Sequence, residues 1–208
     1  MNVVKKYGWL NNVSPDSCNY VAPKILSIIK NISCKRVIDI GSGNGSLAGL
    51  FFNANYYVAG VEYDKDGIKQ SRLNHPKINF YNLGVQDNPR SILLKEKYKF
   101  DLAVSTEVIE HLFSPHLLPI FAKKVLRPGG YLVISTPYHG YLKNLLLSLF
   151  NKWDDHHTSL WHGGHVKFWS KNTLTDLLED NGFKVVNFYG AGRLPFLWKS
   201  MILVAKVI

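Results

Sequence analysis

The sequence predicts a single α/β domain with a mostly parallel seven-stranded sheet, helices on both faces and a C-terminal antiparallel strand pair. Three observations predict it. The length of 208 residues suits one domain with a full core. From Lys35 onward, short apolar runs alternate with helix-like segments, which is typical of a parallel sheet covered by helices. The last two apolar runs are joined by AGRLPFLW, a connection too short for a helical crossover.

Each element follows from the hydrophobic pattern. Strands are expected at residues 35–40, 56–62, 77–82, 100–105, 130–136, 183–190 and 199–208. Helices are expected over residues 17–30 and 170–181, from about 45, from Lys65, near 90, from Thr106 and from Pro115. Residues 1–33 are expected to form an N-terminal cap and helix. Residues 138–169, rich in aromatic side chains and histidine, interrupt the alternation, and we interpret them as an insertion that serves as a substrate lid.

Composition and charge limit the class of protein and the partners that are expected. Hydrophobic residues make up 46% of the chain and charged residues 19%, as in an ordinary globular protein. Cys18 and Cys34 form no CxxC pair, and neither a signal-like N-terminus nor a membrane-spanning run is visible, so we expect a cytoplasmic protein. The net charge of +10 favours an anionic partner, but the positive charges are scattered, and nucleic acid is the less favoured partner.

The segment VIDIGSGNG predicts a ligand site. Asp39 comes near the end of a buried strand, and Gly41, Gly43 and Gly45 allow a turn that a ligand can approach closely. Glu62 ends the next strand, where a carboxylate accepts hydrogen bonds from a ribose diol. The GxGxG spacing differs from the dinucleotide pattern, and no Walker lysine follows. A nucleoside-containing ligand is therefore expected, and a ligand-free glycine turn is the less favoured alternative.

Four motifs together resemble a known family. VIDIGSGNG, GVEYD, FDLAVSTEVIEHL and LRPGGYLVIST are similar to the successive motifs of class I S-adenosylmethionine-dependent methyltransferases, which have a Rossmann-like fold. The resemblance extends from about Lys35 to the C-terminus. It implies S-adenosylmethionine as the cofactor and methyl transfer as the activity.

The resemblance also implies cofactor contacts. Asp39 and the backbone of Gly41, Ser42 and Gly43 would meet the methionine part. The remaining contacts implied are Glu62 at the ribose, Tyr63 beside the adenine, Ser105 in the methyl-donor pocket, and Tyr7, Trp9 and Tyr20 closing over the cofactor. Gly84 stands where the family often has Asp or Thr, so the adenine contact is expected from the backbone of Val85 or from Asp87.

The segment STEVIEHL predicts a chemical site. On a helix beginning at Thr106, the i, i+3 and i+4 spacing would give Glu107, Glu110 and His111 one face. Acidic residues in a first turn also suit the helix dipole, so a structural role is one alternative. The position after the fourth strand favours chemistry. Glu107 and His111 are therefore the candidate bases for an acceptor hydroxyl.

The pattern ExxEH further resembles ubiquinone-pathway O-methyltransferases and small-RNA 2′-O-methyltransferases, in which these residues hold a divalent metal. By this resemblance His165, in GGHVKFWS, is a further ligand. The implied metal set is Glu107, Glu110, His111 and His165, holding Mg²⁺ or Zn²⁺. A metal-free base remains an equally weighted alternative.

The apolar stripe in residues 142–150 has two interpretations. Leu142, Leu145, Leu146, Leu149 and Phe150 recur at helical spacing and would pack on the domain or rest on an anionic membrane surface. The favoured function is methylation of a hydroxyl oxygen on a small or lipid-like molecule. RNA 2′-O-methylation and a noncatalytic cofactor-binding or scaffold role are the alternatives, and the oligomeric state is left open.

Overall fold

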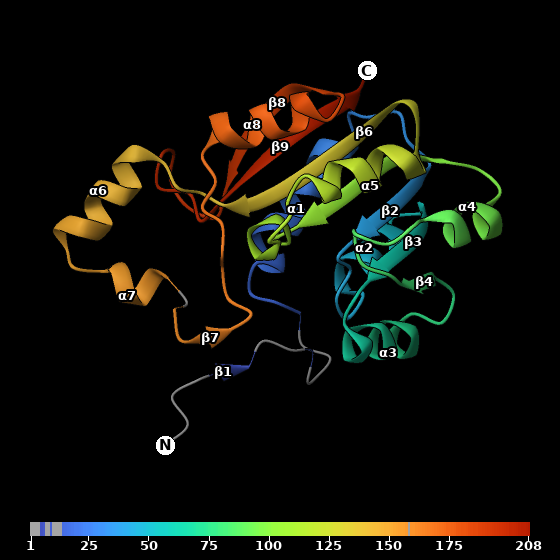
Figure 1. Ribbon diagram of the computed structural model, residues 1–208, viewed down its shortest axis with the longest axis horizontal. Coiled ribbons are helices and arrows are strands. Elements are labelled where there is room, and N and C mark those ends of the chain that lie inside the picture. The colour runs from blue at the N-terminus through green and yellow to red at the C-terminus, as the bar shows by residue number, and fades with distance from the viewer. Residues whose placement is uncertain (1–4, 7–8, 10–13, 158) are drawn as a thin grey trace.

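A seven-stranded sheet forms the centre of the computed structural model, which describes residues 5–6, 9, 14–157 and 159–208. The strand order is β4-β3-β2-β5-β6-β9-β8 (Figure 1). The strands are β2 (Arg36–Ile40), β3 (Tyr57–Glu62), β4 (Asn79–Asn82), β5 (Phe100–Thr106), β6 (Leu126–Pro137), β8 (Phe183–Ala191) and β9 (Ser200–Val207). Strands β4, β3, β2, β5 and β6 pair in parallel, whereas β9 is antiparallel to both β6 and β8. The predicted fold class is confirmed.

Helices cover both faces of this sheet (Figure 1). They are α1 (Cys18–Ile29), α2 (Ser46–Asn53), α3 (Lys65–Asn74), α4 (Arg90–Glu96), α5 (Leu117–Val125), α6 (Tyr141–Leu149), α7 (Trp153–His156) and α8 (Lys171–Asp180). Helices α1, α2 and α3 contribute to one hydrophobic cluster, and α4, α5 and α8 to the other. Val37 and Ile38, neighbours on β2, belong to opposite clusters, as the alternation of a strand requires.

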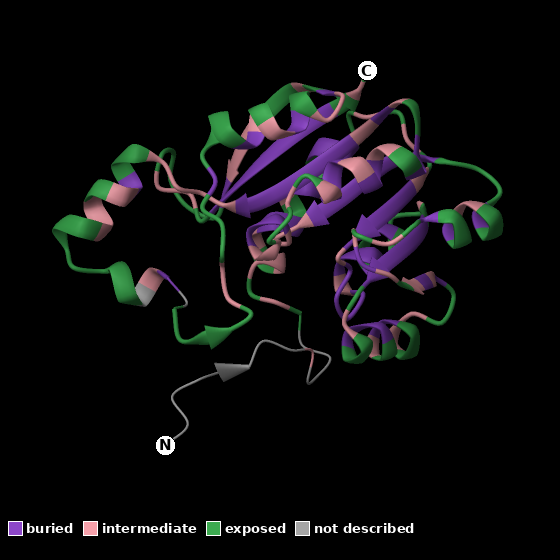
Figure 2. Ribbon diagram, in the orientation of Figure 1, coloured by how far each residue is buried: buried purple, intermediate pink, exposed green. Residues whose placement is uncertain are grey.

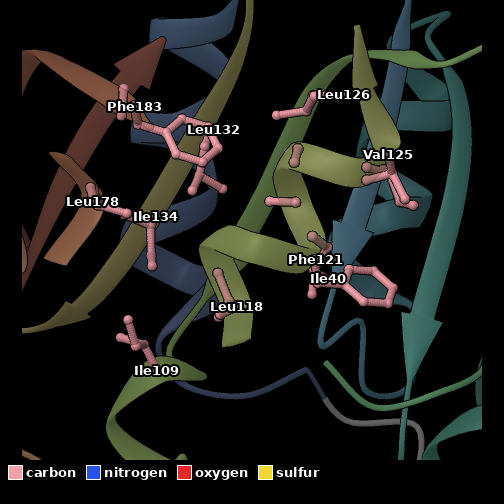
Figure 3. Packing of buried hydrophobic residues seen from close by; sticks show 14 of the residues in the cluster. Ile40, Ile109, Leu118, Phe121, Val125, Leu126, Leu132, Ile134, Leu178 and Phe183 are labelled. Atoms are coloured by element: carbon pink, nitrogen blue, oxygen red, sulfur yellow. The ribbon is translucent and has the colours of Figure 1, made fainter. Parts of the chain in front are cut away.

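The central strands form a buried layer between the two sets of helices (Figure 2). Figure 3 shows one side of this layer, where Phe121 of α5 and Leu178 of α8 lie over the sheet with Leu132 and Ile134 of β6. All four are almost fully buried, and each such side chain contributes about 1.5–3 kcal/mol of hydrophobic free energy. This packing fixes the carboxyl ends of β5 and β6, where the predicted site residues lie.

The helix predicted from Thr106 is wrong. Strand β5 continues to Thr106, and Glu107 then has a φ of 53°, a left-handed conformation that an α-helix cannot contain. The Glu107 amide donates to the carbonyl of Ser135 on β6, 3.1 Å away, so the neighbouring strand competes successfully for this backbone. Only a short 3₁₀ turn, η1 (Ile109–His111), follows. The three predicted residues therefore do not share the face of one helix.

The segment 138–169 contains α6, α7 and the short strand β7 (Trp161–His162). Figure 1 shows α6 and α7 beyond the end of the sheet toward which the β6 arrow points. Strand β7 pairs in parallel with β1 (Lys5–Lys6), which places these two lysines beside the insertion. None of the helices in the described ranges has the length and apolar character needed to cross a membrane. Tyr7 lies outside the described residues.

Candidate active site

The glycine turn after β2 is held against the end of β3. The amides of Gly41 and Ser42 both donate to the carbonyl of Val61, at 2.8 and 2.9 Å. Gly41 has a φ of 81°, and a Cβ atom there would lie 2.4 Å from a methyl group of Val108. Glycine is therefore required for the backbone conformation and for the close approach of the next segment.

Asp39 and Glu62 place two carboxylates behind this turn. Neither carboxylate oxygen of Asp39, which is 1% exposed, has a hydrogen-bond partner among the described residues. Burial, and then the nearby charge of Glu62, raises the pKa of Asp39 to about 7. Glu62 accepts hydrogen bonds from the amides of Gly43 and Asp64, both at 2.7 Å. Asp39 is thus a buried acceptor that lacks a donor, which a cationic or N–H-bearing ligand would supply.

A cavity of about 260 Å³, called the glycine-turn cavity below, opens beside these residues. The predicted cofactor residues Asp39, Gly41, Ser42, Glu62 and Tyr63 line it. Gly43 contributes through its hydrogen bond to Glu62. Trp9 also lines the cavity, and its ring lies so close to Gly43 that a Cβ atom there would be 2.2 Å from it.

Four other predicted cofactor residues do not line this cavity: Tyr20, Val85, Asp87 and Ser105. Val85 packs against the hydrophobic core cluster. Ser105 is fully buried, and its hydroxyl donates to the carbonyl of Ile40 at 2.9 Å. Ser105 therefore joins two neighbouring strands beneath the cavity.

Glu107 stands at the boundary between two cavities. It lines the glycine-turn cavity and also a second cavity of about 240 Å³, called the histidine cavity below. The other residues lining the histidine cavity are Tyr20, Pro137, Lys143, His156, His165, Arg193 and Lys199. Burial raises the pKa of Glu107 to about 7, although a hydrogen bond from Ser135 opposes the shift. Such a carboxyl exchanges protons near neutral pH, as a general base must.

Glu110, His111 and His165 come together in space. Each offers one potential ligand atom, and these atoms lie within 4.8 Å of one another. The rings of His111 and His165 meet edge to face, with centroids 5.0 Å apart. Glu110 is 1% exposed; its Oε2 accepts from Thr136 at 3.0 Å, and its Oε1 has no hydrogen-bond partner in the described part of the chain. Glu107, the fourth predicted ligand, is not in this group.

Backbone contacts from the end of the insertion bring His165 to the η1 turn. The amides of Val166 and Lys167 both donate to the backbone carbonyl of Glu110, at 2.9 and 3.0 Å. The carbonyl of Gly163 lies 2.8 Å from Nδ1 of His111. A carbonyl only accepts, so Nδ1 carries a proton, and Nε2 lies 4.0 Å from Oε1 of Glu110.

The local electrostatics keep both imidazoles neutral. Burial, and then His111 and His157, lowers the pKa of His165 to about 4, and burial lowers the pKa of His111. Burial, and then Glu107, raises the pKa of Glu110. Neutral imidazoles are the form that binds metal ions.

Sequence reasoning missed three cationic residues of the histidine cavity. Lys143 lies within the apolar stripe, and its i+3 and i+4 spacing to Leu146 and Leu147 is a signal that it shares their side of the helix. Arg193 and Lys199 come from the β8–β9 connection. No local sequence pattern predicts their position, because only the antiparallel pairing of β8 and β9 brings them to the site.

Comparison with known proteins agrees with this geometry. The family described as a methyltransferase domain matches residues 18–187. The ubiquinone biosynthesis O-methyltransferase of Hydrogenovibrio crunogenus is 24% identical over 149 residues, 70% of this chain and 58% of that protein. The enzyme of the same name from Roseobacter denitrificans is 28% identical over 167 residues, 78% of this chain and 65% of that protein. The matched part thus spans less than two thirds of either relative.

Solved structures share the fold. The magnesium protoporphyrin IX methyltransferase of Synechocystis PCC 6803 with bound SAH superposes with a TM-score of 0.66 at 16% identity, covering 90% of this chain and 82% of that one. At this identity the likeness concerns the fold alone. The extent of the family match, over most of the sheet and both of its helical layers, decides the assignment: the chain belongs to the class I S-adenosylmethionine-dependent methyltransferases.

Proposed function

We propose that this chain transfers the methyl group of S-adenosylmethionine to a hydroxyl oxygen of a small or lipid-like molecule. The observation that carries the proposal is the position of Glu107, which lines both the glycine-turn cavity and the histidine cavity. A carboxyl with a pKa of about 7 at that boundary meets a methyl donor on one side and an acceptor on the other.

The glycine-turn cavity suits the cofactor. The unpartnered carboxylate of Asp39 is suited to the ammonium group of the methionine part, because an ionised donor is the natural partner of a buried carboxylate. Glu62 already accepts two backbone hydrogen bonds, and each of its oxygens keeps a lone pair for a ribose hydroxyl. Trp9 and Tyr63 offer ring surfaces beside them for the adenine.

The reaction at this boundary is a direct displacement. The acceptor oxygen attacks the methyl carbon, the carbon–sulfur bond breaks, and its electron pair stays on sulfur. The hydroxyl proton passes to the Glu107 carboxylate, since a neutral hydroxyl is a poor nucleophile. His111 lines the glycine-turn cavity and is the second candidate base. Most of the remaining rate enhancement comes from alignment of donor and acceptor.

A divalent metal is a second part of the proposal, carried by Glu110, His111 and His165. One carboxylate and two neutral imidazoles are a donor set of zinc enzymes, whereas Mg²⁺ prefers oxygen ligands. Tetrahedral ligands about 2.1 Å from zinc lie about 3.4 Å apart, so atoms within 4.8 Å need only a small closure. When bound, the ion would lower the pKa of an acceptor hydroxyl.

The names of the relatives support oxygen as the acceptor atom, since both relatives described above are O-methyltransferases. RNA 2′-O-methylation is less favoured because the charge of +10 is scattered. Steep salt dependence of RNA binding would reverse this order.

The test is transfer of a labelled methyl group from S-adenosylmethionine to a panel of catechols, phenols, hydroxy acids and short RNA, with identification of the methylated atom. We expect labelled methyl ethers, and we expect Glu107→Gln to lose most of the rate while retaining S-adenosylhomocysteine binding. Glu179→Gln, at an exposed position of α8, is the matched control. Methylation of nitrogen or carbon, or full activity in Glu107→Gln, would refute the proposal.

A further inference from the structure

We infer that the acceptor is an amphiphilic acid, whose apolar chain lies between α6 and the β8–β9 connection and whose acidic group is held by Lys143 and Arg193. This inference rests on the proposed function and names the substrate class of the same site. It depends on a third cavity, on the unusual burial pattern of α6 and on two cations at a shared boundary.

The third cavity, called the leucine groove below, has a volume of about 400 Å³. Its lining residues are Lys143, Leu146, Leu147, Phe150, Lys152, Arg193, Leu194 and Leu197. Phe150 is 65% exposed and Leu194 74% exposed, so an apolar surface on both sides of the groove faces solvent. Contiguous apolar surface of this kind marks binding sites, because water solvates it poorly.

Helix α6 has the reverse of an ordinary surface pattern. Lys143 is its buried residue, whereas Leu142, Leu145 and Leu149 are exposed. The helix therefore does not pack its apolar stripe on the domain, which was one of the two expectations for this segment. It directs a lysine inward and leaves leucines available to a ligand.

The Lys143 ammonium is buried, and the charge of Glu107 acts on it from beyond ion-pair distance. Its Nζ donates to the carbonyl of Tyr138 at 2.8 Å and lies 3.5 Å from that of Lys199. Within the part of the chain that the structure describes, no carboxylate forms an ion pair with Lys143 or Arg193. A buried ammonium that no carboxylate contacts directly is costly, and an acidic ligand in direct contact would reduce that cost.

The three cavities are neighbours that share lining residues. The leucine groove and the histidine cavity share Lys143 and Arg193, and the histidine cavity shares Glu107 with the glycine-turn cavity. A molecule with its chain in the groove and its acidic group at the two cations therefore extends its polar end toward Glu107. The charged side chains lining the groove are all basic, which selects an acid over a neutral or cationic amphiphile.

The inference is tested by calorimetric titration of the full chain, saturated with S-adenosylhomocysteine, with decanoate below its micellar concentration. The comparison ligands are 1-decanol, decyltrimethylammonium and acetate. We expect decanoate to bind at least tenfold more tightly than any of the three, because it alone offers both the chain and a negative charge. Equal affinity for decanoate and 1-decanol would overturn the inference.

Variants locate the contacts. Lys143→Met removes the charge and preserves the length of the side chain. It should lower the decanoate affinity at least tenfold without weakening the binding of 1-decanol. Arg193→Gln, at an exposed position where unfolding is not expected, should act in the same direction, and Lys124→Met on the exposed side of α5 should have no effect. Unchanged decanoate binding in Arg193→Gln and Lys143→Met would refute the assignment.

Two further readouts separate the outcomes. S-adenosylhomocysteine affinity is measured for every protein, so that loss of the proposed cofactor function is seen independently of decanoate binding. Cosedimentation with phosphatidylglycerol vesicles tests the other use of an exposed basic and apolar surface. Vesicle binding without binding of monomeric decanoate would contradict the inference in favour of a membrane surface.

Discussion

Ser135 on β6 holds Glu107 by two hydrogen bonds. Its hydroxyl donates to Oε1 of Glu107 at 2.7 Å, and its carbonyl accepts from the Glu107 amide at 3.1 Å. A fully buried serine thus fixes both the backbone and the carboxylate of the residue between the two cavities. The left-handed conformation of Glu107 persists because the neighbouring strand supplies these partners.

Substitution of Ser135 should change the pH dependence of catalysis. The hydroxyl stabilises the charged carboxylate, so Ser135→Ala should raise the pKa of Glu107 further and move the acidic limb of kcat to higher pH. We also expect a loss of about 1 kcal/mol of unfolding free energy. Ser71→Ala removes another buried hydroxyl, which donates to the carbonyl of Ile68, and should reduce stability without moving the limb. An identical pH profile in both variants would contradict this role.

The wild-type rate should rise with pH around 7 as Glu107 loses its proton and becomes able to accept one. Glu107→Gln should abolish that limb and lower kcat by about 10²- to 10⁴-fold. Measurement of kcat from pH 5 to 9 at saturating substrate tests both statements. If the acidic limb of the pH profile persists in Glu107→Gln, the general base is another group.

Asp39 should raise the affinity for the cofactor and lower the unfolding free energy of the ligand-free protein. Its pKa is raised from 3.8 to about 7, so the unfolded chain releases this proton first and stability falls as pH rises between those values. Asp39→Asn should therefore raise the unfolding free energy by about 1–3 kcal/mol at pH 8, and by less at pH 5, while S-adenosylhomocysteine affinity falls at least tenfold.

Urea unfolding at the two pH values and calorimetric titration measure these effects. Asp66→Asn, at an exposed position in α3, should change neither quantity. A less stable Asp39→Asn protein that binds the ligand normally would show that Asp39 has a structural role only.

Metal binding should depend on the three clustered residues and not on Glu107. We expect calorimetric titration to show that one Zn²⁺ ion binds per chain. Glu110→Gln and His165→Ala should each lower the Zn²⁺ affinity at least tenfold. Glu107→Ala should retain most of the Zn²⁺ affinity. His116→Ala, at an exposed position before α5, is the control. The absence of any Zn²⁺ heat in the wild type would remove the metal from the proposal.

Much of the fold was predictable because its signals are local. Val37 and Ile38 belong to a short apolar run that ends in glycines, and such runs are recognisable without tertiary information. The helix expected from Thr106 failed because the amide of Glu107 pairs with Ser135, which lies on another strand. The acidic and apolar spacing of STEVIEHL fits a helix equally well, so no local pattern distinguishes the two outcomes.

The site residues that belong to a local sequence motif were predictable. Asp39 and Glu62 end consecutive parallel strands, and the sheet brings such ends together. His165 was found through resemblance, and backbone bonds to Glu110 explain its position. Arg193 could not be predicted, because its approach to Lys143 depends on the path of a connection between two antiparallel strands.

The two amide hydrogen bonds from Val166 and Lys167 to Glu110 join the end of the insertion to the η1 turn. Any molecule that orders the insertion must therefore also restrict the distances among Glu110, His111 and His165. Because linkage is reciprocal, an acceptor that orders segment 138–169 would raise metal affinity, and a bound metal would raise acceptor affinity by the same factor.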